Sequence, residues 1–363
     1  MLGLALALAL AAQPAEDGRL PPPDRKLYQI AWHRDLAGKT LGEWRPEELG
    51  GVARDPVTRL VVAGTRDGWL HALREDGSLA WEFQGGGAFA GQPLIDGDTV
   101  YAGCNDGRLY ALALATGKER WRYESKEQLG TRPAILGGIV YVASLQDTLY
   151  AVDARTGAWK WHYRREVGEG FTVEGAASVA AADGLVHAGF SDGSLVAFEA
   201  GTGAIRWERH AAPRGNYTDV DSLVLSGGKL YAAAFSGAVV ALDAASGKPL
   251  WQFEVPEASR VAMVAPGLLL AVTTRSVLAL SPVDGHRLWS TPLQGSPAGV
   301  PRVAGRWLLV PAGNGGLRIL ELASGRAMGV LDTGTGVSAS LALAGNRAWL
   351  LSNGGWLLAL RFE

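Results

Sequence analysis

The stretch ALDAASGKPLW, Ala241–Trp251, decides the fold because variants of it recur along the chain about 40 residues apart. In most copies, a turn of small residues leads to a tryptophan. The other copies are LHALREDGSLAW (70–81), LYALALATGKERW (109–121), LYAVDARTGAWKW (149–161), LVAFEAGTGAIRW (195–207), VLALSPVDGHRLW (277–289) and LRILELASGRAMG (317–329), which ends in glycine. Such a period is typical of repeat architectures, so one unit predicts the whole fold.

Each unit predicts four short strands. A β run such as TVYAG (99–103) is followed by the turn NDG, the run RLYALAL (108–114), a Thr-Gly turn and a run that closes on the tryptophan. A further apolar run, such as QPLID (92–96), precedes each unit. Asn-Asp-Gly and Thr-Gly favour the positive φ angles of tight hairpins. Four-stranded units of this length match the blades of a β-propeller.

The two ends of the chain complete an eighth unit. Seven full units occupy residues 46 to about 332, and AWLLSNGGWLLALRF (348–362) supplies strands without a tryptophan strand. YQIAWHRDL (28–36) has Trp32 but no strands before it. We therefore predict an all-β fold over residues 28–363: an eight-bladed propeller of four-stranded antiparallel blades, closed by pairing of the N-terminal strand with the C-terminal blade. Seven blades is the alternative.

The recurring tryptophans are expected to dock one blade on the next. A ring that buries up to ~250 Å² contributes at most about 6 kcal/mol of transfer free energy. The residues expected in this structural role are Trp32, Trp81, Trp121, Trp161, Trp207, Trp251 and Trp289.

Composition excludes several classes of function. The 34 basic and 36 acidic residues leave a net charge of −2, without the basic cluster that nucleic acid binding requires. Cys104 is the only cysteine, so an internal disulfide and a multi-cysteine zinc site are excluded, and we expect it to be a small buried residue. The six histidines have no ligand spacing. We expect no catalytic residue, no cofactor and no metal.

The N-terminal segment resembles an export signal. Residues 1–12, MLGLALALALAA, are too short for a membrane span and resemble the apolar region of a signal peptide, although no lysine or arginine precedes them. Residues 13–27 are expected to form a proline-rich linker. We predict a periplasmic protein, and the absence of a cysteine near Ala11 and Ala12 does not support a lipid anchor.

The phrase A-x-D-x-x-[TS]-G-x-x-x-W resembles the repeat of pyrroloquinoline quinone (PQQ) type propellers. Eight units with N-terminal closure more closely resemble the BamB family of outer-membrane β-barrel assembly factors, and YTDVDSLVLSGG (217–228) carries an Asp-Val-Asp at the family's spacing. The resemblance implies a non-catalytic periplasmic scaffold, peripheral to the outer membrane and monomeric within a complex. Its implied partners are a BamA-like barrel assembly subunit and nascent outer-membrane proteins.

The resemblance also implies a docking site. It places the partner on Asp219 and Asp221, and on a second segment that falls on Phe171, Val173 and Glu174. The family has a basic residue where Glu174 stands, so the partner would need a compensating change. From the residues alone, Asp219 and Asp221 lie at i and i+2 of an extended chain and face the same way. Such a pair contacts a basic partner, shares a cation or is simply solvated.

Two alternatives come from other functional classes. A ligand-sensing propeller would bind a small molecule or glycan in its axial funnel, with Trp69, Trp159 and Trp356 as candidate lining residues. A PQQ-dependent dehydrogenase is less favoured because such enzymes resemble this repeat but add long insertions and adjacent cysteines. The glycine-rich stretches GGGAFA (85–90) and GNGG (313–316) fit a loop between blades and a hairpin turn, respectively, better than a phosphate cradle.

Overall fold

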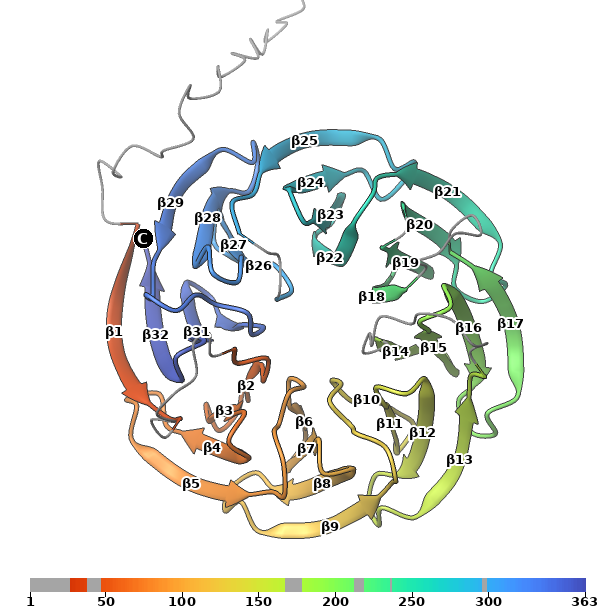
Figure 1. Cartoon of the computed structure of the whole chain (residues 1–363), viewed down its shortest axis with the longest axis horizontal. Helices are drawn as coiled ribbons and strands as arrows, with labels where there is room; N and C mark the ends of the chain where they lie inside the picture. Colours follow the sequence, from red (N-terminus) through yellow and green to blue (C-terminus); the bar gives the residue numbers. More distant parts are fainter. Residues whose placement is uncertain (1–26, 38–46, 167–177, 212–218, 236, 296–298) are drawn as a thin grey trace, which may run out of the picture.

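The computed structural model describes residues 27–37, 47–166, 178–211, 219–235, 237–295 and 299–363. Every regular element in these ranges is a β-strand, and the strands form eight four-stranded antiparallel sheets arranged as blades around a central axis (Figure 1). This confirms the eight-bladed propeller and excludes the seven-bladed alternative. Within the same ranges, no helix has the length and apolar character that a membrane span requires.

The blades follow the order of the chain, and each runs from an inner strand near the axis to an outer strand at the rim (Figure 1). Blades 1 to 4 comprise β2 (Val52–Arg54), β3 (Val61–Gly64), β4 (Trp69–Leu73) and β5 (Leu79–Gln84); β6 (Leu94–Asp96), β7 (Thr99–Gly103), β8 (Arg108–Ala113) and β9 (Glu119–Glu124); β10 (Ala134–Leu136), β11 (Ile139–Ala143), β12 (Thr148–Asp153) and β13 (Trp159–Arg164); β14 (Val179–Ala182), β15 (Leu185–Gly189), β16 (Ser194–Glu199) and β17 (Ile205–His210).

Blades 5 to 8 repeat this plan. They comprise β18 (Val220–Ser226), β19 (Lys229–Ala234), β20 (Ala238–Asp243) and β21 (Pro249–Glu254); β22 (Ala258–Ala265), β23 (Leu268–Thr273), β24 (Ser276–Leu280) and β25 (Arg287–Pro292); β26 (Arg302–Ala304), β27 (Trp307–Pro311), β28 (Leu317–Glu321) and β29 (Ala327–Leu331); β30 (Ala342–Ala344), β31 (Arg347–Leu351), β32 (Trp356–Phe362) and β1 (Tyr28–Asp35).

Blade 8 closes the ring with both ends of the chain, as predicted. Strand β1 pairs antiparallel with β32 from Tyr28 opposite Phe362 to Asp35 opposite Trp356. Backbone hydrogen bonds from Leu36 N to Gly355 O (2.9 Å) and from Glu363 N to Leu27 O (3.3 Å) extend the seam. Leu27, grouped with the linker in the sequence, is only 7% exposed and packs in this seam.

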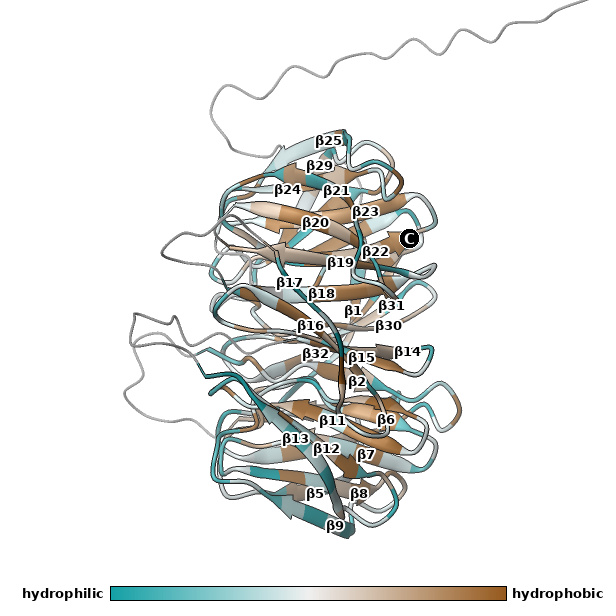
Figure 2. Ribbon diagram, turned by 90° about the vertical axis from the view of Figure 1, so that its right-hand side faces the viewer, coloured by the Kyte–Doolittle hydropathy of each residue, from teal (hydrophilic) through white to brown (hydrophobic). Residues whose placement is uncertain are grey.

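The core lies between blades. The middle strands β7 and β11 are buried along their whole length because each sheet is covered on both faces by its neighbours. The outer strand β13 has several exposed residues, with Trp161 buried among them, and Figure 2 shows apolar colour concentrated in the body of the blades. Cys104 is buried as expected, and burial raises the pKa of its thiol to about 12.

The seven repeat tryptophans each lie against the turn glycine of the next blade. Trp207 is representative: its Nε1 donates to Ala244 O at 2.9 Å, and its ring covers Gly247, where an added Cβ would lie 2.6 Å from Cδ2. Glycine is required there because its φ is also +67°. Equivalent indole-to-carbonyl bonds are made by Trp32, Trp81, Trp121, Trp161 and Trp251.

The unit without a tryptophan stands where the ring is closed. Gly329 lies on β29 of blade 7, and the blade that follows joins β32 to β1 across the two chain ends instead of through a Thr-Gly turn. An indole at this position would have no turn glycine to cover. Leu27 Cδ1 lies 2.9 Å from the Cβ position of Gly329, and Trp307 Nε1 from the second strand of blade 7 donates to Glu363 O at 2.9 Å.

A β-bulge interrupts every outer strand just before the residue at the tryptophan position. In blade 5, for example, Ala241 pairs with Trp251 but Leu242 pairs with Pro249, so Leu250 is extra. A bulge bends a strand and strengthens its local twist, which re-aims the side chain that follows. The same bulge disrupts the exposed edge that an outer strand would otherwise offer to another chain.

The acceptor carbonyl is shared with a second side chain in several blades. Ala154 O accepts both Trp121 Nε1 and the Tyr101 hydroxyl, and Tyr141 and Tyr231 make the same kind of bond in blades 3 and 5. In blade 4 the corresponding residue is His187, whose Nε2 lies 2.8 Å from Ala244 O.

Replacing His187 with tyrosine is expected to make the fold less sensitive to acid. Burial lowers the pKa of His187 below 6.5, so the unfolded chain takes up a proton more readily than the folded one. The free energy of unfolding therefore falls as the pH drops below 6.5, by at most about 1.4 kcal/mol per pH unit.

Denaturant unfolding at pH 7.5 and pH 5 measures this loss of stability, which should be smaller in His187→Tyr than in wild type. The exposed His210→Tyr should retain the wild-type loss, and equal losses in all three proteins would contradict the prediction.

Candidate docking face

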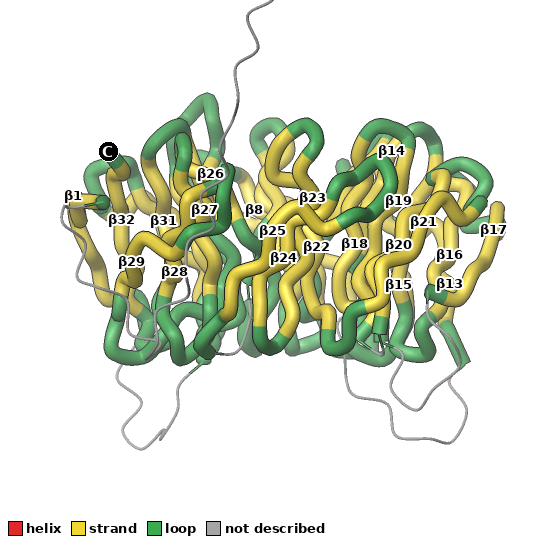
Figure 3. The backbone as a smooth tube through the Cα atoms, turned by 90° about the horizontal axis from the view of Figure 1, so that it is seen from above, coloured by secondary structure: helices red, strands yellow, loops and turns green. Residues whose placement is uncertain are grey.

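The loops of the ring lie on two opposite faces (Figure 3). Because the strands of a blade are antiparallel, the turn between its second and third strands and the link to the next blade lie on the same face. We call this the interblade face. It carries the turns 144–147 of blade 3 and 190–193 of blade 4, together with Asp219 and the start of β18.

Backbone and side-chain bonds join blades 3, 4 and 5 on the interblade face. The carboxylate of Asp147 accepts a hydrogen bond from Ser191 N at 3.1 Å and another from the Ser191 hydroxyl. Val220 N donates to Phe190 O at 3.2 Å, and Phe235 N donates to Asp219 O at 2.9 Å. The entry into β18 is therefore held by the blade before it as well as by its own.

Asp147 is unusual because it stands where the equivalent turns of blades 2 and 4 have glycine. Its φ is +59°, whereas Gly107 and Gly193 at the same place have φ of +87° and +81°. Its side chain is buried, and burial raises the pKa of the carboxyl. Sequence analysis missed this residue, although the replacement of glycine in a repeated turn was a visible signal. A positive φ is unfavourable for a residue other than glycine, and the hydrogen bonds to Ser191 offset this backbone strain.

Arg165 organises the rim of the same face. Its Nε lies 2.8 Å from Asp192 Oδ2, one terminal nitrogen lies 2.8 Å from Glu208 Oε1, and the other donates to Ser194 Oγ at 2.9 Å. The guanidinium and the Asp192 carboxylate are mostly buried. This arginine thus ties the end of blade 3 to two strands of blade 4.

The structure changes the interpretation of the Asp219 and Asp221 pair. Asp219 is only 6% exposed and makes contacts within the protein, so it is not a solvated carboxylate. Along β18, Val220 pairs with Ala234 and Ser222 with Ala233, which makes Asp221 the extra residue of a β-bulge. The backbone of β18 therefore departs from strict alternation at this point, and the side chain of Asp221 lies outside the described part of the chain.

The other predicted contact residues, Phe171, Val173 and Glu174, lie outside the described residues. The sequence places them between Arg165 and β14, in the link from blade 3 to blade 4.

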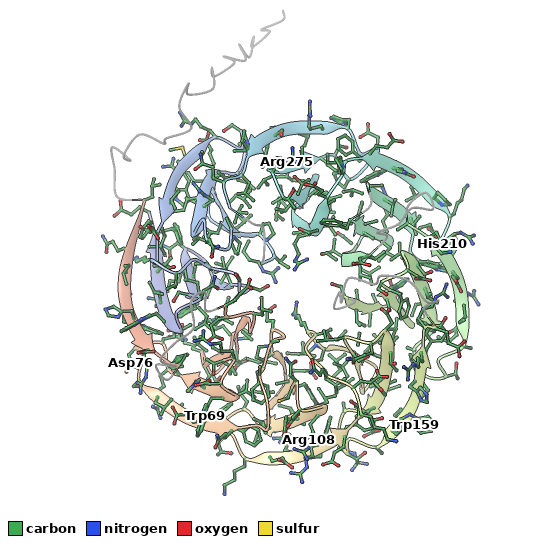
Figure 4. The ribbon with its side chains drawn as sticks, viewed as in Figure 1. Trp69, Asp76, Arg108, Trp159, His210 and Arg275 are labelled. Atoms are coloured by element: carbon green, nitrogen blue, oxygen red, sulfur yellow. The ribbon has the colours of Figure 1, made fainter. Side chains whose placement is uncertain are left out.

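The tryptophans considered for an axial funnel do not lie on inner strands. Trp69 is on β4, Trp356 on β32, and Trp159 on the outer strand β13, where it is 56% exposed. Figure 4 shows Trp69 and Trp159 well away from the central opening. In the part of the chain that the structure describes, no group of histidine, cysteine, aspartate and glutamate side chains is arranged to hold a metal ion.

These features define the class: a closed eight-bladed β-propeller whose blades are docked by tryptophans. The family model described as outer membrane protein assembly factor BamB matches residues 28–114, 66–291 and 237–362, which together span nearly the whole chain. The chain therefore belongs to this family.

Individual relatives agree with the family match. The outer membrane protein assembly factor BamB of Burkholderia pseudomallei is 26% identical over 95% of this chain and 80% of its own length. The protein of that name from Kangiella koreensis is 32% identical, but only 32% of its length is matched. The one from Legionella pneumophila is 29% identical, and 48% of its length is matched.

Two solved structures show the same fold. The crystal structure of BamB from Moraxella catarrhalis is similar with a TM-score of 0.80 and 23% identity, over 92% of this chain and all of that one. A europium-containing methanol dehydrogenase is similar with a TM-score of 0.75 and 14% identity, over 92% of this chain and 93% of that one. At these identities the likeness concerns the fold alone.

Proposed function

We propose that the protein is a non-catalytic periplasmic scaffold in the assembly of outer-membrane β-barrel proteins, and that it docks a BamA-like subunit through its interblade face. Family membership over residues 28–362 is the observation that carries this proposal. The proposed location, at the periplasmic side of the outer membrane, follows from the same membership. Attachment there would occur through protein partners.

The interblade face is suited to docking because its backbone is held from several sides. Hydrogen bonds from Val220 N and Phe235 N fix the segment around Asp219 between blades 4 and 5. Next to it, Arg165 and its acidic partners hold the rim of blade 4. A rigid site loses little conformational entropy on binding, which favours recognition by a few well-placed residues.

The acidic entry of β18 provides the test. We expect Asp221→Ala to lower co-purification of the barrel assembly subunit from the native envelope about tenfold, as for a hot-spot residue. Asp219→Asn should act in the same direction, and asparagine is used there because an alanine would leave a hole at a buried position. Thermal unfolding of each variant, compared with wild type, separates a docking defect from a folding defect.

Asp96→Ala is the matched control. Asp96 is an exposed carboxylate at the end of β6, on the face opposite the interblade face. Its variant should co-purify like wild type. Full recovery of the partner with both Asp221→Ala and Asp219→Asn would contradict the proposed site, and absence of any barrel assembly subunit from the wild-type sample would contradict the proposed function itself.

A further inference from the structure

A cavity of about 350 Å³ lies on the axis of the propeller. Its wall comes from the inner strands β2, β6, β26 and β30 and from Arg132, two residues before β10. Leu94, Ile95, Leu341 and Leu343 make part of the wall apolar. The volume falls within the range of pockets that bind small molecules.

Among the described residues, all charged side chains that line this cavity are positive. They are Arg54, Arg132 and Arg302, and the described part of the lining contains no acidic residue. Arg54 is neutralised by Glu75, whose Oε1 lies 2.6 Å away. For the guanidinium groups of Arg132 and Arg302, no ion pair or hydrogen bond is found within the described ranges.

The two arginines converge from opposite sides of the ring. Arg132 precedes the inner strand of blade 3 and Arg302 lies on the inner strand of blade 7, four blades away in a ring of eight (Figure 1). Surrounding protein lowers the pKa of both guanidinium groups, and the positive charge of Arg132 further lowers that of Arg302. Both guanidinium groups line one cavity, where like charges repel.

Two unneutralised guanidinium groups that line one cavity are unfavourable without a counter-charge. Each presents a planar fork of donors that matches the two oxygens of a carboxylate or a phosphate. A ligand with an acidic group at each end would pair with both arginines at once. The leucine and isoleucine wall would cover the carbon skeleton between the two groups.

We propose that this axial cavity binds a small organic di- or tricarboxylate between Arg132 and Arg302. The inference is independent of partner docking, because the cavity residues are distinct from those of the interblade face. It also assigns the ligand site to Arg132 and Arg302 instead of Trp69, Trp159 and Trp356.

Isothermal titration with citrate and succinate tests the site, with sodium chloride added to equal ionic strength in every sample. Wild-type protein should bind at least one of the two. Arg132→Gln and Arg302→Gln should each weaken binding tenfold or more, and the double variant should abolish it. The control is Arg287→Gln, because Arg287 is exposed on the outer strand β25. This variant should bind like wild type.

A second measurement guards against variants that merely misfold. Without ligand and at low salt, the double variant should unfold at a temperature equal to or above that of wild type, because the like-charge repulsion is gone. Citrate should raise the unfolding temperature of wild type only. Equal citrate affinity in wild type and the double variant, or no binding to wild type, would overturn the proposal. Tighter binding of pyrophosphate or of a poly-glutamate peptide than of citrate would overturn the carboxylate assignment.

Discussion

Replacing Trp207 with alanine is expected to lower the free energy of unfolding by about 3 to 5 kcal/mol, the range for truncating a buried aromatic side chain. The indole is 6% exposed, covers Gly247 of the next blade and donates to Ala244 O. Its removal leaves a void between blades 4 and 5, which the glycine cannot fill. Chemical denaturation monitored by circular dichroism measures the loss.

Trp159→Ala is the control for this effect. Trp159 lies on an outer strand and is mostly exposed, and among the described residues it makes no hydrogen bond to another blade. Its loss should cost less than about 1 kcal/mol, as for an exposed residue. A similarly small cost for Trp207→Ala would show that the tryptophans do not dock the blades.

Adding one methyl group on the other side of the same contact should also be strongly destabilising. In Gly247→Ala, the new Cβ would lie 2.6 Å from the Trp207 ring at a residue whose φ is +67°. The left-handed conformation costs about 1 to 2 kcal/mol for a non-glycine residue, and overpacking adds about 1 to 3 kcal/mol. We therefore expect a total loss of about 2 to 5 kcal/mol in denaturant unfolding.

Gly228→Ala separates the cost of the left-handed backbone conformation from the cost of overpacking. Gly228 lies in a hairpin turn of the same blade with φ of +72°, and nothing is within 4 Å of its Cβ position. This variant should show the conformational cost alone, about 1 to 2 kcal/mol. If both variants lost the same stability, the contact between tryptophan and glycine would carry no packing energy.

Much of the architecture follows from local pattern. A hairpin depends on the few residues of its turn, so Asn-Asp-Gly and Thr-Gly sequences predict the strands around them. The incomplete unit at each end predicted that β1 would pair with β32, and the register from Tyr28 to Asp35 confirms it. Repetition reinforces each inference, because every unit must bury the same faces.

The docking face was less predictable because it depends on contacts between units. The backbone between Asp219 and Ser222 contains a β-bulge, which is set by pairing with β19 and which no local pattern indicates. The burial of Asp219 results from the packing of blades 4 and 5. Asp147 and Arg165 gain their partners from blade 4, beyond the unit that contains them.

The sequence by itself determined the repeat, the number of blades, their closure and the place of each repeat tryptophan, because these depend on turns and strands of short range. Only the tertiary structure decided which residues meet across blades. It showed that Gly329 faces the closure seam and that Arg132 and Arg302 share one cavity. Residues from opposite blades are brought together by the curvature of the completed ring, and no local pattern encodes that curvature.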